Sequence, residues 1–368
     1  MPSVSLSAPR ARPLAVVALI AAMAGALSPS AITSAAALAE AATAASAETA
    51  AAAQESTATH ATAPRRIAIA IHGGAGVIPR DQLTDGGVVY RAGLEEALDA
   101  GYAVLEKGGS SLDAVTTAVR LLEDNPLFNA GRGAVLAHDG RAYLDASIMD
   151  GKDLAAGAVT GVTTVRHPID LARRVMERSP HVMLAGDGAE EFAGLQGLER
   201  VPNEWFITPT RKRQLERVLT GATAPRNELQ GLGTVGAVAV DAAGNVAAAT
   251  STGGMTNKRW GRIGDAPIIG AGTYANNASC AVSATGHGEY FIRSVVAYDI
   301  CALVEYKGWT LAQAAREVVQ GKLVRRGGEG GIIAVDPQGN VVLEFNSPGM
   351  FRGLRDSTGR RQVAIHED

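Results

Sequence analysis

The stretch Gly233-Thr-Val-Gly-Ala-Val-Ala-Val240-Asp-Ala-Ala-Gly-Asn245-Val-Ala-Ala-Ala-Thr-Ser-Thr252 decides how this chain folds. Residues 234–240 and 246–252 are mainly apolar, and the residues between them have turn chemistry, so the stretch predicts a β-hairpin. A turn centred on Ala243 places Thr234 opposite Thr252. Opposed residues of an antiparallel pair point to the same face of a sheet. The sequence therefore predicts that the two threonine hydroxyls lie side by side.

The step from Gly233 to Thr234 has a possible chemical meaning of its own. A small residue before a threonine at the start of a strand suits self-cleavage of the backbone, which would leave Thr234 as a new N-terminus. A free α-amine titrates at roughly 7.7–8.0, so it can serve as general base for the hydroxyl on the same residue. The alternative is that Thr234 is only a β-branched residue beginning a strand, and the dipeptide alone favours that reading.

Composition sets the class of protein. The chain has 368 residues, 46% of them hydrophobic, and a net charge of −3. It can bury a large core and has no overall charge that would draw it to nucleic acid or an anionic membrane. No nucleic-acid partner is expected.

The N-terminal region differs from the rest. Arg10 and Arg12 precede the apolar run 14–27, a pattern typical of a signal peptide and too short for a membrane span. We expect a signal peptide at 1–39, a low-complexity linker at 40–64, export to a periplasm-like compartment and no membrane segment in the mature form. The alternative is an internal Ala-rich helix.

The two cysteines give little guidance. Cys280 and Cys301 could pair in an oxidising compartment, but two cysteines make no disulfide framework. The favoured expectation is two buried thiols.

The folded part is expected to begin near residue 65, with strands in hairpins and helices in pairs. This arrangement predicts a layered α+β domain. Further hairpins are expected around Asp139-Gly140, joining 134–137 to 141–146, and near the C-terminus. Residues 208–232 are expected to form a mobile connection. Helices are expected at 91–106, 111–124, 168–177, 289–306 and from Thr310, where Gln313 completes a capping box.

Several ordered motifs resemble one family. They are Ile71-His-Gly-Gly-Ala-Gly76, Asn125-Pro-Leu-Phe-Asn-Ala-Gly131, Gly233-Thr-Val-Gly-Ala-Val238, Ser251-Thr-Gly-Gly-Met-Thr-Asn-Lys258, Gly261-Arg-Ile-Gly-Asp265 and Gly272-Thr-Tyr-Ala-Asn-Asn277. Together they resemble the plant-type asparaginases, or isoaspartyl peptidases, of the N-terminal-nucleophile hydrolases, over residues 66–351. The resemblance implies a four-layer αββα sandwich, cut into an α-subunit (65–233) and a β-subunit (234–368).

The resemblance also implies roles for individual residues. Thr234 would be the nucleophile, and its freed amine the base. Thr252 would hydrogen-bond the nucleophile, and Asn129 would support its surroundings. Thr285 and the Gly286 N–H would form the oxyanion hole. Arg262 would bind the substrate α-carboxylate, with Asp265 and the Gly288 carbonyl on its ammonium. Without the resemblance, Arg262 and Asp265 could simply pair with each other at the surface.

No cofactor for catalysis is implied, but a structural sodium ion is. Backbone carbonyls would hold it, at Leu122, Glu123, Asn125, Phe128, Ala130 and Arg132. The family also suggests a dimer of αβ units. His72 and His287 are expected to be structural, since the mechanism needs no histidine.

These features predict a threonine hydrolase that cleaves β-aspartyl dipeptides and L-asparagine to release L-aspartate. One rival is a glycosylasparaginase-like amidase with the same fold and nucleophile. Another is an uncleaved, non-catalytic exported binding protein. The sequence does not rank asparagine against isoaspartyl dipeptides.

Overall fold

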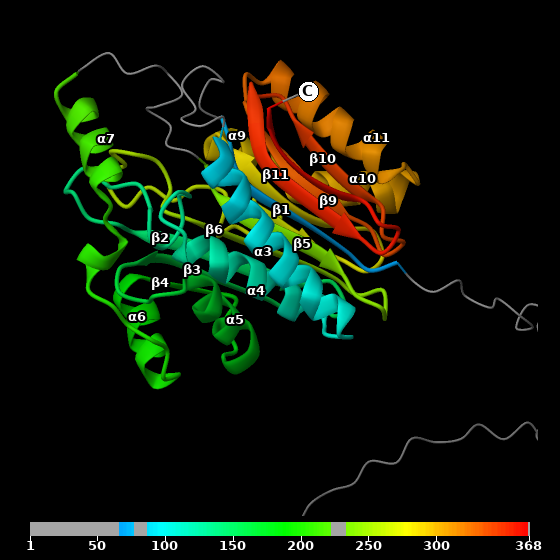
Figure 1. Ribbon diagram of the computed structural model, residues 1–368, viewed down its shortest axis with the longest axis horizontal. Coiled ribbons are helices and arrows are strands. Elements are labelled where there is room, and N and C mark those ends of the chain that lie inside the picture. Colours follow the sequence, from blue (N-terminus) through cyan, green and yellow to red (C-terminus); the bar gives the residue numbers. More distant parts are fainter. Residues whose placement is uncertain (1–65, 77–86, 222–232, 367–368) are drawn as a thin grey trace, which may run out of the picture. The chain divides into compact units, whose positions relative to one another are not determined.

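The computed structural model describes residues 66–76, 87–221 and 233–366 (Figure 1). The chain divides into two compact units, Met1–Ala63 and Pro64–Asp368, and every described residue belongs to the second. The expected signal peptide and linker lie outside the described residues, as do residues 222–232. In the described part, no helix is long and apolar enough to cross a membrane.

One of the two described sheets has eight strands in the order β12-β11-β1-β5-β6-β2-β3-β4. Neighbouring strands are antiparallel except β3 and β4, which run parallel. The strand bounds are β1 Ala68–Ala75, β2 Leu144–Asp150, β3 Ala156–Val162, β4 Met183–Ala185, β5 Val235–Val240, β6 Val246–Thr252, β11 Gly349–Asp356 and β12 Arg361–His366.

The other described sheet has four antiparallel strands in the order β10-β9-β8-β7. Its strands are β7 Thr273–Ala275, β8 Ala281–Gly286, β9 Gly330–Val335 and β10 Val341–Phe345.

Helices cover the outer face of each sheet, as Figure 1 shows for α3 and α4 on one side and α10 and α11 on the other. On the eight-stranded side the helices are α3 Val88–Glu106, α4 Ser111–Asp124, α5 Pro168–Arg178 and α6 Gly186–Leu195. On the four-stranded side they are α9 Gly288–Ser294, α10 Val296–Lys307, α11 Leu311–Arg316 and the π-helix η5 Glu317–Leu323.

Three apolar clusters separate four layers. Side chains alternate between the faces of a strand, and in β1 the residues Ile69 and Ile71 pack under the helices while Ala68 and Ala70 face the second sheet. In β9, Ile332 packs under α10 and α11, whereas Ile333 faces the first sheet. The expected αββα sandwich is confirmed, with an apolar layer between the two sheets.

The hairpin at 233–252 is confirmed in its register. Val235 pairs with Ser251 and Val240 with Val246, the register that puts Thr234 opposite Thr252. The turn is held by the Asp241 carboxylate, whose Oδ1 accepts from the Ala243 and Asn245 N–H groups. Asp336 and Asp356 make the same kind of turn in the C-terminal hairpins.

The expected connection at 208–232 is wrong over its first half. Residues Pro209–Leu219 form helix α7, which Thr208 caps by accepting from the Arg211 N–H, and a short 3₁₀ helix, η4 Asn203–Phe206, precedes it. Arg211 is buried, and its Nε donates to the Gly133 carbonyl at 2.6 Å. Helix α7 is held mainly by one buried arginine rather than by a stripe of apolar side chains. The apolar periodicity that indicates a helix is therefore absent from its sequence.

Two other elements differ from expectation. Ala137 and Arg141 close the turn at Asp139-Gly140, but residues 134–137 are not a strand, because the Val135 N–H bonds to the Asn129 side chain instead of a neighbouring strand. The helix expected at 289–306 is broken into α9 and α10 at Val295, which has a left-handed backbone with φ of 51°.

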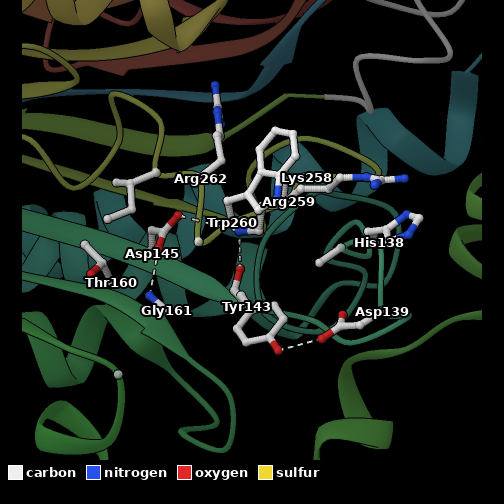
Figure 2. Close-up of a pocket in the computed structure, with 14 residues that line it drawn as sticks. His138, Asp139, Tyr143, Asp145, Thr160, Gly161, Lys258, Arg259, Trp260 and Arg262 are labelled. Atoms are coloured by element: carbon white, nitrogen blue, oxygen red, sulfur yellow. Dashed lines mark hydrogen bonds and ion pairs between the residues drawn. The ribbon is translucent and has the colours of Figure 1, made fainter.

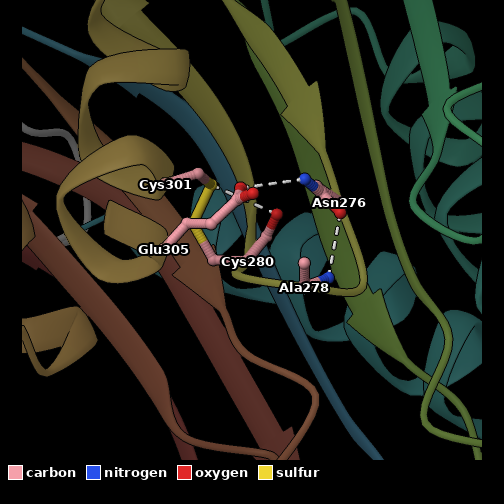
Figure 3. The surroundings of a disulfide bond; sticks show 5 residues. All are labelled: Asn276, Ala278, Cys280, Cys301 and Glu305. Carbon is pink, nitrogen blue, oxygen red and sulfur yellow. Dashed lines mark hydrogen bonds between the residues drawn. A yellow bond between two sulfur atoms is a disulfide. The ribbon is translucent and has the colours of Figure 1, made fainter. Parts of the chain in front are cut away.

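The expectation of two free thiols is wrong. Cys280, just before β8, and Cys301, in α10, form a disulfide with a Cα–Cα distance of 5.4 Å (Figure 3). The bond ties a helix of the outer layer to the strand that carries Thr285. A disulfide that closes a loop of this length stabilises the folded state by about 3 kcal/mol, mainly because it restricts the unfolded chain.

Candidate active site

A small pocket of about 50 Å³ opens at one end of the layer between the sheets. Its lining comes from segments far apart in the sequence and combines two threonines with charged and backbone groups. The lining residues used below are Gly233, Thr234, Thr252, Gly254, Arg262, Asp265, Gly286, His287, Glu289 and Glu329. Thr285, Gly288 and Asn129 lie directly behind this lining.

Thr234 and Thr252 meet as the register requires. The Thr234 hydroxyl donates to Thr252 Oγ1 at 3.2 Å, and Thr252 Oγ1 also accepts from the Gly254 N–H at 2.9 Å. Thr234 is only 8% exposed. Burial and the bond to Thr252 together fix the orientation of its hydroxyl. The predicted contact between the two hydroxyls is confirmed.

Asn129 fixes the loop that follows Thr252. Its Nδ2 donates to the Gly254 carbonyl at 2.8 Å, and its Oδ1 accepts from the Val135 N–H at 2.8 Å. The side chain is fully buried. Asn129 is therefore connected to Thr234 through Gly254 and Thr252, and among the described residues no direct bond joins Asn129 to Thr234.

The chain packs tightly around Gly233. A Cβ at this position would lie 2.5 Å from Thr285 Oγ1 and 2.9 Å from the Ala75 nitrogen. Thr285 Oγ1 also accepts from the Ala75 N–H at 3.2 Å. Only glycine fits before Thr234, and the Thr285 hydroxyl lies immediately beside the Gly233–Thr234 junction.

Arg262 is paired, but with a residue that the sequence analysis missed. Its Nε and Nη2 donate to the two carboxylate oxygens of Glu289 at 2.9 and 3.1 Å. A guanidinium has five N–H donors, so this bidentate pair orients Arg262 and leaves donors for a second carboxylate. The alternative in which Arg262 pairs with Asp265 is not what the structure shows.

Asp265 is the buried acid of the pocket. It is 3% exposed, and its Oδ2 has no hydrogen-bond partner within the described residues. Burial raises the pKa of Asp265 to about 7, against the lowering effects of a backbone hydrogen bond and of Arg262. A Cβ on Gly288 would lie 2.9 Å from both Asp265 Oδ1 and Arg262 Nη2, so a glycine is needed where these two side chains meet.

Gly286 lines another part of the pocket, together with Glu329 and His287. Gly286, at the end of β8, has a φ of 151° and lies against the Glu329 carbonyl. The backbone N–H of His287 donates to the Glu329 carbonyl at 2.9 Å.

The six residues expected to hold sodium lie in the last turn of α4 and in the loop that follows it. The Arg132 N–H donates to the Glu123 carbonyl at 2.7 Å. Gly133 has no room for a side chain, because a Cβ there would lie 2.7 Å from the Phe128 carbonyl oxygen. Of the six expected ligands, the structure places the Phe128 carbonyl oxygen against Gly133 and the Glu123 carbonyl oxygen against Gly131. Carbonyl oxygens are donors that suit a hard cation. No cluster of His, Cys, Asp or Glu side chains able to hold a metal occurs in the described part of the chain.

A larger cavity of about 470 Å³ lies beside the pocket and shares Arg262 with it (Figure 2). Lys258 is buried there, and its Nζ donates to the Tyr143 carbonyl at 2.7 Å and lies 3.8 Å from Asp145 Oδ2. A Cβ on Gly254 would lie 2.8 Å from that Nζ. Lys258 therefore packs against Gly254, in the loop that follows Thr252.

Sequence reasoning missed three supporting residues, Lys258, Glu289 and the side chain of Glu123. Glu123 is fully buried, and its Oε1 accepts from the Ser251 hydroxyl at 2.6 Å and from the Ile169 N–H at 3.1 Å. Desolvation raises the pKa of Glu123 well above its usual value. Lys258 ends one quoted motif and Glu123 stands two residues before another, but nothing in those motifs says which partners the two side chains take.

Two facing sheets covered by helices, with a threonine at the pocket end of the layer between them, define the class of N-terminal-nucleophile hydrolases. The family profile described as Asparaginase matches residues 65–365, and the chain belongs to that family.

Named relatives are similar over most of their length. The isoaspartyl peptidase of Salmonella typhimurium is 57% identical over 295 residues, covering 78% of this chain and 94% of the relative. The isoaspartyl peptidase of Escherichia coli is 55% identical, with 78% and 92% covered. The human isoaspartyl peptidase/L-asparaginase is 45% identical over 284 residues, with 77% and 91% covered.

The raised pKa of Asp265 leads to a pH prediction. Below pH 7 the carboxyl takes up a proton and no longer attracts a substrate ammonium group, so kcat/KM should fall as the pH drops. If cleavage frees the α-amine of Thr234 to act as the base, that amine must also lose its proton, and two groups then shape the acid side of the profile. Asp265→Asn should lower kcat/KM at pH 8 by at least tenfold and leave an acid limb that depends on one proton. An unchanged two-proton limb would contradict the assignment.

Proposed function

We propose that this protein is a threonine hydrolase that becomes active by cleavage between Gly233 and Thr234. It then releases L-aspartate from β-aspartyl dipeptides and from L-asparagine. The observation that carries the proposal is the Thr234–Thr252 hydroxyl pair, in one pocket with Arg262 and Asp265. The names of the relatives, isoaspartyl peptidase and isoaspartyl peptidase/L-asparaginase, support it.

Activation would begin at the Gly233 carbonyl. Thr234 Oγ1 attacks the carbonyl carbon, and the hydroxyl proton passes to the amide nitrogen. The C–N bond then breaks, the nitrogen leaves as the α-amine of Thr234, and Gly233 is held as an ester on Oγ1. Water then hydrolyses the ester. Because Thr285 Oγ1 lies beside Gly233 in the intact chain, departure of Gly233 would uncover this hydroxyl for a substrate.

In the substrate reaction, Arg262 would bind the α-carboxylate with the donors that Glu289 leaves free. Ionised Asp265 and the Gly288 carbonyl would bind the α-ammonium. These contacts would place the side-chain carbonyl over Thr234 Oγ1, with its oxygen toward the Thr285 hydroxyl and the Gly286 N–H. Loss of one oxyanion donor commonly lowers kcat by about 10²–10³-fold.

In the chemical step, Thr234 would supply both the nucleophile and the base. Its hydroxyl attacks the side-chain carbonyl, and its α-amine takes the proton and passes it to the departing ammonia or amino acid. An aspartyl ester remains on Thr234. Water, activated by the same amine, releases L-aspartate and restores the hydroxyl.

The test is mass spectrometry together with an L-aspartate release assay. Wild-type protein should give two fragments, one beginning at Thr234, and should hydrolyse a β-aspartyl dipeptide. Thr234→Ala should remain one chain and lose at least 10³-fold in activity, whereas Thr220→Ala, at an exposed threonine on the end of α7, should match wild type. Hydrolysis by Thr234→Ala would sink the proposal. A glycosylasparagine substrate in parallel tests the amidase alternative, and an uncleaved, inactive wild type would support a binding protein.

The sodium ion belongs to the same proposal. The carbonyls of Leu122, Glu123, Asn125, Phe128, Ala130 and Arg132 would hold it. The support is the close approach of the Phe128 and Glu123 carbonyl oxygens to the loop glycines and the Arg211 anchor at Gly133. A ligand that binds only the folded state raises stability with its concentration. The unfolding midpoint should therefore rise with sodium chloride but not with choline chloride of equal ionic strength. Equal unfolding midpoints in the two salts would refute the proposed sodium site.

Export is a further part of the proposal. The basic region and apolar run before residue 28 support a signal peptide, and the Cys280–Cys301 disulfide suits an oxidising compartment. The mature protein from its native host should begin after residue 35. A native N-terminus at Met1 or Pro2 would refute export.

A dimer of two cleaved units is proposed from the family resemblance alone. Light scattering of the cleaved protein should give about twice the mass of one αβ unit. The mass of a single unit would refute it.

A further inference from the structure

A line of buried polar side chains crosses the layer between the two sheets. It begins at His72 of β1 and continues through hydroxyl groups of four other strands. All of these side chains are essentially inaccessible to solvent, in a layer that is otherwise apolar. The hydroxyl groups belong to Ser283 of β8, Thr250 of β6, Thr273 of β7 and Ser147 of β2.

The line leads to the backbone of the nucleophile. His72 Nδ1 lies 2.9 Å from the Thr234 carbonyl oxygen, and His72 Nε2 lies 2.9 Å from Ser283 Oγ. Ser283 Oγ lies 2.7 Å from Thr250 Oγ1. Thr273 Oγ1 donates to Thr250 Oγ1, and Ser147 Oγ bonds both Thr273 Oγ1 and the Ala266 carbonyl.

The carbonyl at the end of the line dictates where the protons lie. A carbonyl only accepts, so His72 Nδ1 carries the proton and Nε2 is left as an acceptor. Ser283 must then donate to Nε2, and it can only accept from Thr250. Thr250 in turn accepts from Thr273. Each of these hydroxyls has one proton, so the line from Thr273 to His72 is polarised toward Thr234. The single proton of Ser147 goes either to Thr273 or to the Ala266 carbonyl.

Burial keeps this histidine neutral. Desolvation lowers the pKa of His72 to about 3, and the bond to the Thr234 carbonyl opposes the change without cancelling it. The ring therefore holds one tautomer across the working pH range and is no acid or base in the reaction.

Gly236 is a second, independent sign that this contact is built into the sequence. It is paired with His72 across β1 and β5. A Cβ at this position would lie 2.5 Å from His72 Nε2 and would also collide with Ser283 Oγ. The strand that begins after the nucleophile thus lacks a side chain where the His72–Ser283 bond needs the space.

We propose that His72 is a positioning residue that holds Thr234 in its reactive orientation after cleavage. The inference rests on the proposed function. Once the bond to Gly233 is broken, Thr234 has no covalent support on its N-terminal side. Its carbonyl is then held by His72 and its hydroxyl by Thr252, and these two points fix the direction of the free amine.

Two substitutions separate this role from a purely structural one. In His72→Asn the amide nitrogen takes the place of Nδ1 and can still donate to the Thr234 carbonyl, but the bond to Ser283 is lost. In His72→Gln the terminal amide takes the place of Nε2 and can still accept from Ser283, but the bond to Thr234 is lost. Each variant removes one buried hydrogen bond, so the two form a matched pair.

We expect kcat, measured on a β-aspartyl dipeptide and divided by the cleaved fraction from mass spectrometry, to fall at least tenfold in His72→Gln. It should fall less than threefold in His72→Asn, and KM should change little in either. Unfolding midpoints should fall in both variants to a similar extent. Equal losses of kcat in the two variants, or none in His72→Gln, would overturn the proposal.

Two further measurements keep the proposal testable if His72→Gln does not fold. Ser283→Ala removes the partner of Nε2 but leaves the Thr234 carbonyl to hold the Nδ1–H, so it should lower the unfolding midpoint while kcat falls less than threefold. In ¹⁵N spectra of histidine-labelled wild-type protein, His72 should show a protonated Nδ1 that does not titrate between pH 5 and 9. An Nε2-protonated ring, or a loss of kcat of tenfold or more in Ser283→Ala, would refute it. Activity in Thr234→Ala would instead refute the proposed function, so the two failures are distinct.

Discussion

The antiparallel register between β5 and β6 is the constraint on which the site depends. A shift of one residue would turn every side chain of β5 to the opposite face. Thr234 would then point toward the helices instead of the pocket and would lose its contact with Thr252. The short Asp241–Asn245 turn sets this register, with one carboxylate oxygen accepting two backbone N–H groups. A turn at the far end of the hairpin thus decides where the side chain of Thr234 points.

The layer between the sheets has a different character along its length. Its middle is filled by small and branched apolar side chains such as Ala70, Val238 and Ile333. Toward the pocket it becomes polar, with His72 and hydroxyl groups that satisfy one another. Buried polar groups are costly when unpaired and rigid when fully paired. The polar end therefore gives the threonine at its edge a fixed frame, in a region where an apolar core would specify position less sharply.

Much of this could be predicted from the sequence, for reasons that are local. The hairpin at 233–252, helix α4 and the Thr310–Gln313 capping box follow from periodicity and turn chemistry. What was missed depends on partners distant in the chain. The stretch of α7 is rich in basic residues, and only the packing of Arg211 against Gly133 explains its place. The Arg262–Glu289 pair and the Cys280–Cys301 bond likewise arise from tertiary proximity, and spacing alone does not reveal them.

The order of strands in the large sheet has a consequence for the cleaved protein. If the chain is cut before Thr234, β1 belongs to one fragment but lies between β11 and β5 of the other. The disulfide joins two cysteines of the same fragment, so no covalent bond would link the halves. The fragments would nevertheless be interleaved and unable to part without dismantling the sheet. Once unfolded, they would have to find each other again from solution. Maturation would thus turn a chain that can refold alone into an assembly whose lifetime is set by its rate of unfolding.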